Sequence, residues 1–141
     1  MDQPKRGRNE SNPPEGLKQI LASIELDYLN PQYGLIAWLE KEGEKGVAEL
    51  GKLLGDRELV AAQATYLATY LRNPAVLTLL EQAATHRYEY VRLSLASGLR
   101  NLSLEDLNKD EVRKIAEILL KDKSAYVAKV AQQTWTQILK Q

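Results

Sequence analysis

Apolar residues recur at helical spacing along almost the whole of this chain of 141 residues. Near its start, Leu17 is followed by Ile20, Leu21 and Ile24, at three, four and seven positions along the chain. Residues at this spacing lie on one side of a helix. No stretch of five residues shows the clear apolar and polar alternation of a half-buried strand. The pattern predicts an all-α fold.

Prolines, glycines and polar capping residues divide the pattern into short helices. Asn-Pro pairs, in which Asn is a good N-cap and Pro suits the first helical position, stand at Asn12, Asn30 and Asn73. Other N-caps are expected at Asp56, Asp110 and Ser124, and helix ends at Gly43 and Gly55. About eight helices result, near residues 13–29, 31–42, 45–54, 57–72, 74–85, 88–102, 111–121 and 125–140.

A helical hairpin repeats three times in the later part of the chain. Alignment of Leu59, Val91 and Val127 gives spacings of 32 and 36 residues. In this register four further sets of positions coincide, among them Gln63, Leu95 and Ala131. Because one hairpin cannot bury its apolar face alone, stacked hairpins would bury a continuous core between layers.

Three segments carry a family resemblance: residues 56–62, 90–96 and 125–131. The middle one, with Val91, Arg92 and Ala96, best matches the signature of the HEAT-repeat family of α-solenoids, whereas Val60 and Ala128 stand where the other two would need the Arg. The chain therefore resembles this family over about residues 45–140. The resemblance implies a right-handed stack of antiparallel helical hairpins, with the second helix of each hairpin on the concave side.

The same pattern gives the domain organisation. Residues 1–11 are polar and are expected to form a disordered tail, and residues 12–141 are expected to form one all-helical domain. Within it, residues 12–43 fit the repeat poorly and are interpreted as an atypical capping hairpin. Residues 44–141 are interpreted as three repeats.

Few residues are suited to catalysis or to metal binding. The chain has no Cys and one His, which excludes disulfides, thiolate metal sites and sites built from several histidines. The run from Gly46 to Leu53 falls one residue short of a phosphate-binding loop, because Leu53 stands where the motif needs a hydroxyl. His86 has no nucleophile or orienting group signalled nearby. We therefore predict no enzyme and no catalytic, cofactor-binding or metal-binding residues.

The charge is balanced overall but uneven along the chain. Residues 15–85 hold 10 acidic and 6 basic side chains, a net charge of −4, whereas residues 86–141 hold 7 and 10, a net charge of +3. The overall charge of zero argues against attraction to nucleic acid or to membranes. No run of 18 apolar residues and no secretory signal occur, so a cytoplasmic protein without a membrane partner is predicted.

These features favour a non-enzymatic protein–protein interaction module, such as an adaptor, an assembly factor or an inhibitor, whose concave second-helix surface binds a protein with an acidic face. Tyr and Arg are enriched in binding hot spots. The predicted partner-binding residues are Tyr88, Tyr90, Arg92, Arg100, Lys129 and Gln133. Two alternatives stay open: a nucleic-acid-binding helical-repeat protein, and an accessory subunit of an enzyme complex such as a HEAT-like lyase. The tyrosines could instead fill gaps between repeats.

Overall fold

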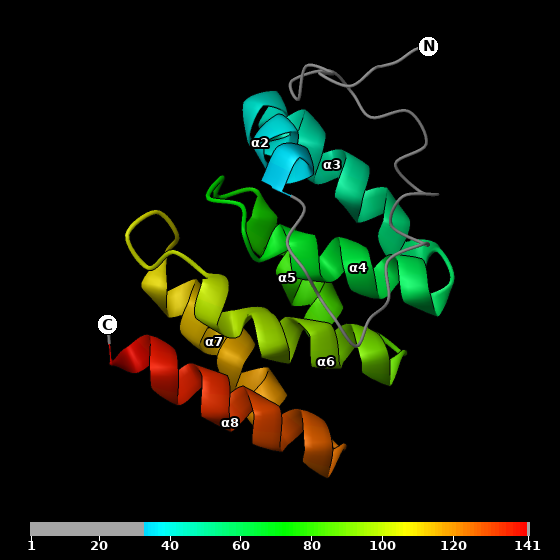
Figure 1. Ribbon diagram of the computed structural model, residues 1–141. Coiled ribbons are helices and arrows are strands. Elements are labelled where there is room, and N and C mark those ends of the chain that lie inside the picture. The colour runs from blue at the N-terminus through cyan, green and yellow to red at the C-terminus, as the bar shows by residue number, and fades with distance from the viewer. Residues whose placement is uncertain (1–32, 141) are drawn as a thin grey trace.

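The computed structural model describes residues 33–140, and its regular structure in that range is entirely helical (Figure 1). Seven α-helices and two short 3-10 helices are present there, which confirms the all-α prediction. They are α2 (Tyr33–Glu42), α3 (Glu44–Lys52), η2 (Leu53–Gly55), α4 (Glu58–Ala68), α5 (Val76–Ala84), α6 (Glu89–Gly98), η3 (Leu99–Asn101), α7 (Lys109–Leu120) and α8 (Ala125–Leu139). The predicted tail 1–11 and first helix 13–29 lie outside the described residues.

The helix ends lie close to the predicted ones, although three of the predicted N-caps are displaced by one or two residues. Ser124 caps α8, as predicted, and its side chain accepts a hydrogen bond from the Val127 N–H at 3.3 Å. The predicted N-cap Asp110 is wrong, because the Asn108 side chain caps α7 and accepts from the Glu111 N–H at 3.0 Å. Asp110 instead lies in the first turn, where its negative charge complements the helix dipole.

Two other predicted caps stand next to the helices that they were expected to begin. Asp56 precedes the N-cap residue Arg57 and accepts a hydrogen bond from its N–H at 2.7 Å. The side chain of Asn73 accepts from the Ala75 N–H at 2.9 Å, within a turn that leads into α5 at Val76. Both residues therefore order the chain just before a helix, although neither is its N-cap.

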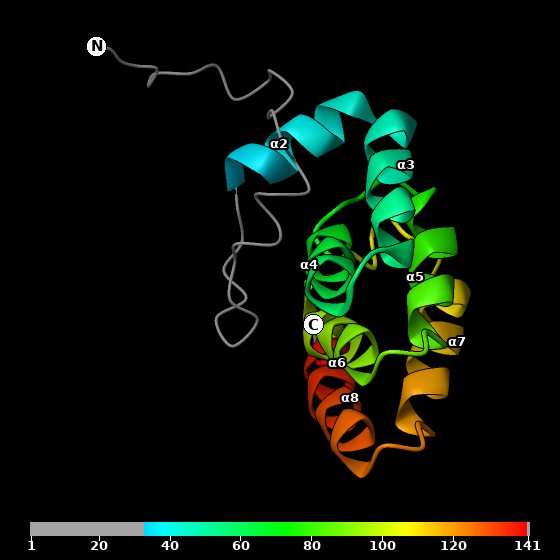
Figure 2. The same cartoon turned by 90° about the vertical axis from the view of Figure 1, so that its right-hand side faces the viewer.

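The helices form two layers. Figure 2 shows α4, α6 and α8 side by side in one layer and α3, α5 and α7 in the other. Short turns join α3 to α4, α5 to α6 and α7 to α8, so each pair spans both layers. The core fills the space between them and includes the fully buried Leu67, Leu80, Leu95, Ile115 and Leu119.

The layer of α4, α6 and α8 has the most extensive helix contacts among the described elements. Gly98 at the end of α6 shows how closely α4 and α6 approach. A Cβ atom built at Gly98 would lie 2.7 Å from the side chain of Thr69, a separation that real side chains do not reach. The close approach therefore requires glycine there. None of the helices between residues 33 and 140 combines the length and apolar character needed to cross a membrane.

Candidate functional site

Hydrogen bonds between side chains and the backbone tie each hairpin to the next at the turns that precede α4, α6 and α8. His86, in the turn before α6, donates from Nε2 to the Leu54 carbonyl at 2.7 Å, and its Nδ1 accepts from the Tyr88 N–H at 3.1 Å. Both ring nitrogens are thus engaged by backbone groups. This bonding gives His86 a structural role, and the residue offers no ring nitrogen for catalysis.

Arg92 makes the corresponding link between the next two hairpins. Its Nε lies 2.8 Å from Oδ2 of Asp122, and one of its terminal nitrogens donates to the His86 carbonyl at 2.8 Å. The prediction that Arg92 lies on an exposed partner-binding surface is wrong, because the residue is only 6% exposed. Asp122 stands 36 positions after His86, the same interval as in the repeat register. That interval places Asp122 in the hairpin turn that corresponds to the turn of His86, and it was the available signal for a partner of Arg92.

The predicted tyrosines differ in exposure. Tyr88 is half-buried against the core, and the guanidinium carbon of Arg87 lies 4.8 Å from the centre of its ring. Tyr90, in the first turn of α6, is 40% exposed. Tyr126 occupies the same repeat position in α8, 36 residues later, and is 61% exposed. Tyr126 was absent from the predicted set, although the register that aligned Val91 with Val127 also aligns these two tyrosines.

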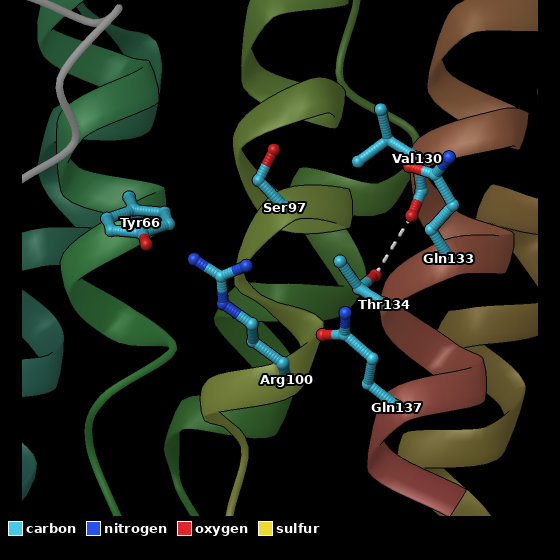
Figure 3. A pocket seen from close by; sticks show the side chains of 7 residues that line it. All are labelled: Tyr66, Ser97, Arg100, Val130, Gln133, Thr134 and Gln137. Atoms are coloured by element: carbon cyan, nitrogen blue, oxygen red, sulfur yellow. Dashed lines mark hydrogen bonds between the residues drawn. The ribbon is translucent and has the colours of Figure 1, made fainter.

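A groove of about 330 Å³ lies on the α4, α6 and α8 side of the fold (Figure 3). Its lining residues are Tyr66, Ser97, Arg100, Val130, Gln133, Thr134 and Gln137. Figure 3 shows the guanidinium of Arg100 extending past Ser97 toward Tyr66, with Gln137 pointing toward Arg100 from α8 and Gln133 lying beside Val130. The structure therefore brings two of the predicted site residues, Arg100 and Gln133, to one groove.

The remaining predicted residues lie away from that groove. Lys129 is exposed on α8, one helical turn before Gln133. Tyr88 and Tyr90 lie at the opposite end of α6 from Arg100, about 15 Å away along a helix that rises 1.5 Å per residue. The predicted set therefore forms a strip along α6 and α8, with Arg92 withdrawn into the interior.

The surface of α6 and α8 carries more basic than acidic groups. Arg100 and Lys129 are exposed, and neither makes a hydrogen bond or an ion pair with the described part of the chain. The helix α8 has no acidic residue. The carboxylate of α6, Glu89, accepts a hydrogen bond from the Ser124 hydroxyl at 2.5 Å. The strip is thus weakly basic, as the net charge of residues 86–141 predicts.

No arrangement suited to a metal ion is found within residues 33–140, where no three His, Cys, Asp or Glu side chains come together.

Comparison with known proteins adds no family assignment. No protein-family model matches the chain, and no curated protein or solved structure gives a significant match.

Proposed function

We propose that this chain is a non-enzymatic protein–protein interaction module that binds its partner through the strip formed by α6 and α8. The observation that carries the proposal is the groove around Arg100, in which the guanidinium and the side-chain amides of Gln133 and Gln137 have no hydrogen-bond partner among the described residues. Unengaged donors and acceptors of this kind are suited to a polar protein surface. The basic strip favours a partner with an acidic face.

We also propose that the hairpins form a short α-solenoid of the HEAT type, stacked with a right-handed turn. The hydrogen bonds between hairpins support this, because Leu54 with His86 and Thr69 with Asn101 each stand one repeat of 32 residues apart. A third bond, from Thr134 to Ala96, joins the next two hairpins across 38 positions, two more than the repeat spacing there. A stack of this kind curves toward its more closely packed layer. The tight contact of Gly98 with Thr69 favours α4, α6 and α8 as the concave layer.

Affinity capture from native lysate, followed by measurement of the affinity for each captured protein, tests the proposed surface. The test variant carries Arg100→Glu and Lys129→Glu. The control carries Lys114→Glu in α7 and Lys121→Glu at the C-cap of α7, in the other layer, where both lysines are exposed. Each variant reverses two positive charges. The proposal expects the test variant to weaken partner binding at least about tenfold, a loss of about 1.4 kcal/mol, and the control to bind as the wild type does.

Equal binding by both variants would contradict the proposed surface. Duplex DNA of random sequence provides the second arm, since the nucleic-acid alternative requires binding that weakens steeply as salt rises. Binding of DNA at low salt, together with no captured protein that distinguishes the two variants, would favour that alternative over the proposed function.

A further inference from the structure

A second hollow, of about 790 Å³, lies between the turn after α4 and the segment that joins η3 to α7. Its volume is in the range of pockets that hold small organic ligands, about 300–1,000 Å³. The residues that matter to its chemistry are Tyr70, Arg72, Arg100, Glu105 and Lys109. It shares Arg100 with the first groove and is otherwise built from different residues.

The lining of this hollow has an excess of positive charge. It includes three cationic side chains, Arg72, Arg100 and Lys109, and one carboxylate, Glu105. Arg72 is 73% exposed, and its Nε lies 3.8 Å from Asp106, which is a weak, solvent-screened ion pair. Arg100 and Lys109 have no ion-pair partner in the described part of the chain. Cations that gather in one hollow repel one another, and an anion bound between them would relieve that repulsion.

We propose that this hollow binds a phosphate monoester. The three cations and one carboxylate of its lining, together with Asp106 beside Arg72, leave a net charge of +1, which attracts an anion. The planar guanidinium groups of Arg72 and Arg100 are suited to paired hydrogen bonds with phosphate oxygens, and Lys109 adds a compact positive charge. A phosphate presents three acceptor oxygens to these three cations, whereas a carboxylate presents two.

The ring of Tyr70 provides a surface against which the organic part of the ligand packs in this proposal. Tyr70 lines the hollow and packs edge-on against Tyr66, with 5.7 Å between the two ring centres. Two sources can supply the same chemistry: a small phosphorylated molecule, or a phosphorylated side chain of a peptide. The proposal names the phosphate monoester that they share, and the experiment separates them.

The test measures binding by calorimetry and by backbone amide NMR shifts at low ionic strength, with four probes: inorganic phosphate, phenyl phosphate, a phosphoserine peptide and the same peptide without phosphate. Arg72→Gln and Lys109→Gln should each weaken binding of the phosphorylated probes about five- to tenfold. Glu105→Gln should strengthen it about threefold, because a repelling charge is removed. Arg113→Gln, which alters an exposed arginine of α7 paired with Asp110, should change it less than about twofold.

Phenyl phosphate bound as tightly as the phosphoserine peptide would support a small-molecule ligand, and a peptide bound tenfold more tightly would support a phosphorylated partner segment. No saturable binding of any phosphorylated probe would overturn the proposal. So would binding that Arg72→Gln and Lys109→Gln leave unchanged while NMR spectra show folded variants. Arg72→Gln and Lys109→Gln do not alter α6 or α8. If the phosphate proposal is refuted, the proposed partner surface therefore still stands, and if the partner surface is refuted, the phosphate proposal still stands.

Discussion

The guanidinium of Arg92 in α6 lies 2.8 Å from the carboxylate of Asp122 in the turn before α8, and both side chains are almost completely buried. The pair is well satisfied, since Arg92 also donates to the His86 carbonyl and Asp122 accepts from the Ser124 N–H at 2.8 Å. One ion pair therefore fixes the second helical hairpin of the repeat against the third.

Removal of one member of this pair should strongly destabilise the fold. Asp122→Ala leaves the guanidinium of Arg92 buried without its counter-charge, and such changes cost about 3–5 kcal/mol of the free energy of unfolding. Urea denaturation followed by circular dichroism measures this loss. The matched control is Asp110→Ala, which breaks the exposed pair between Asp110 and Arg113 and should cost less than about 1 kcal/mol. Similar losses for both variants would contradict the structural role given to Arg92.

Two glycines of α3 should respond in opposite ways to the same substitution. A Cβ atom at Gly46 would lie 2.5 Å from the backbone oxygen of Leu39 in α2, whereas a Cβ atom at Gly51 would meet nothing within 4 Å. Gly46→Ala should force α2 and α3 apart and cost about 1–3 kcal/mol of the free energy of unfolding. Gly51→Ala should add about 0.5–1 kcal/mol through helix propensity. Chemical denaturation of the two variants checks both signs, and a stabilised Gly46→Ala would refute the close contact.

The helical structure could be predicted from the sequence because it depends on local signals. Apolar spacing and capping residues act within a few positions of one another, and they placed every α-helix of residues 33–140 within a few residues of its observed bounds. The error at α7 was also local. Asp110 and Asn108 are both good N-caps, and the sequence pattern alone does not rank two such residues that stand two positions apart.

The candidate site was less predictable because it depends on how the hairpins stack. Arg92 and Arg100 look alike in the sequence, as arginines of one second helix. Arg92 is buried because its side chain meets Asp122 in the next turn, whereas Arg100 follows the end of α6 at the edge of the stack and stays exposed. Only the contact between hairpins separates these two roles. The hollow around Arg72 and Lys109 was likewise missed, because its residues are 37 positions apart and no local motif joins them.

Two threonines of α8 provide a second test of the contact between hairpins. The hydroxyl of Thr134 is buried and donates to the Ala96 carbonyl of α6 at 2.6 Å. The hydroxyl of Thr136 is exposed and donates to Gln132 of its own helix at 2.8 Å. Thr134→Val keeps the shape and removes the donor, and should cost about 1–1.5 kcal/mol of the free energy of unfolding. Thr136→Val should change it by less than about 0.5 kcal/mol. Equal effects in denaturant titrations would argue against the link between α6 and α8.

Tyr90 and Tyr126, which occupy corresponding positions of two repeats, should contribute to partner binding and not to the stability of the fold. Both are exposed in the first turn of their helices, so Tyr126→Ser should change the free energy of unfolding by less than about 0.5 kcal/mol. If the strip of α6 and α8 binds the partner, the same variant should weaken that complex about tenfold or more, because exposed tyrosines supply large contact areas. Ile118→Ser is the matched control, since Ile118 is a 41% exposed apolar residue of α7 in the other layer. Calorimetry with the captured partner compares the two variants. An equal loss of affinity in both would indicate a nonspecific effect of removing surface apolar area, and no loss in Tyr126→Ser would restrict the interface to the groove around Arg100.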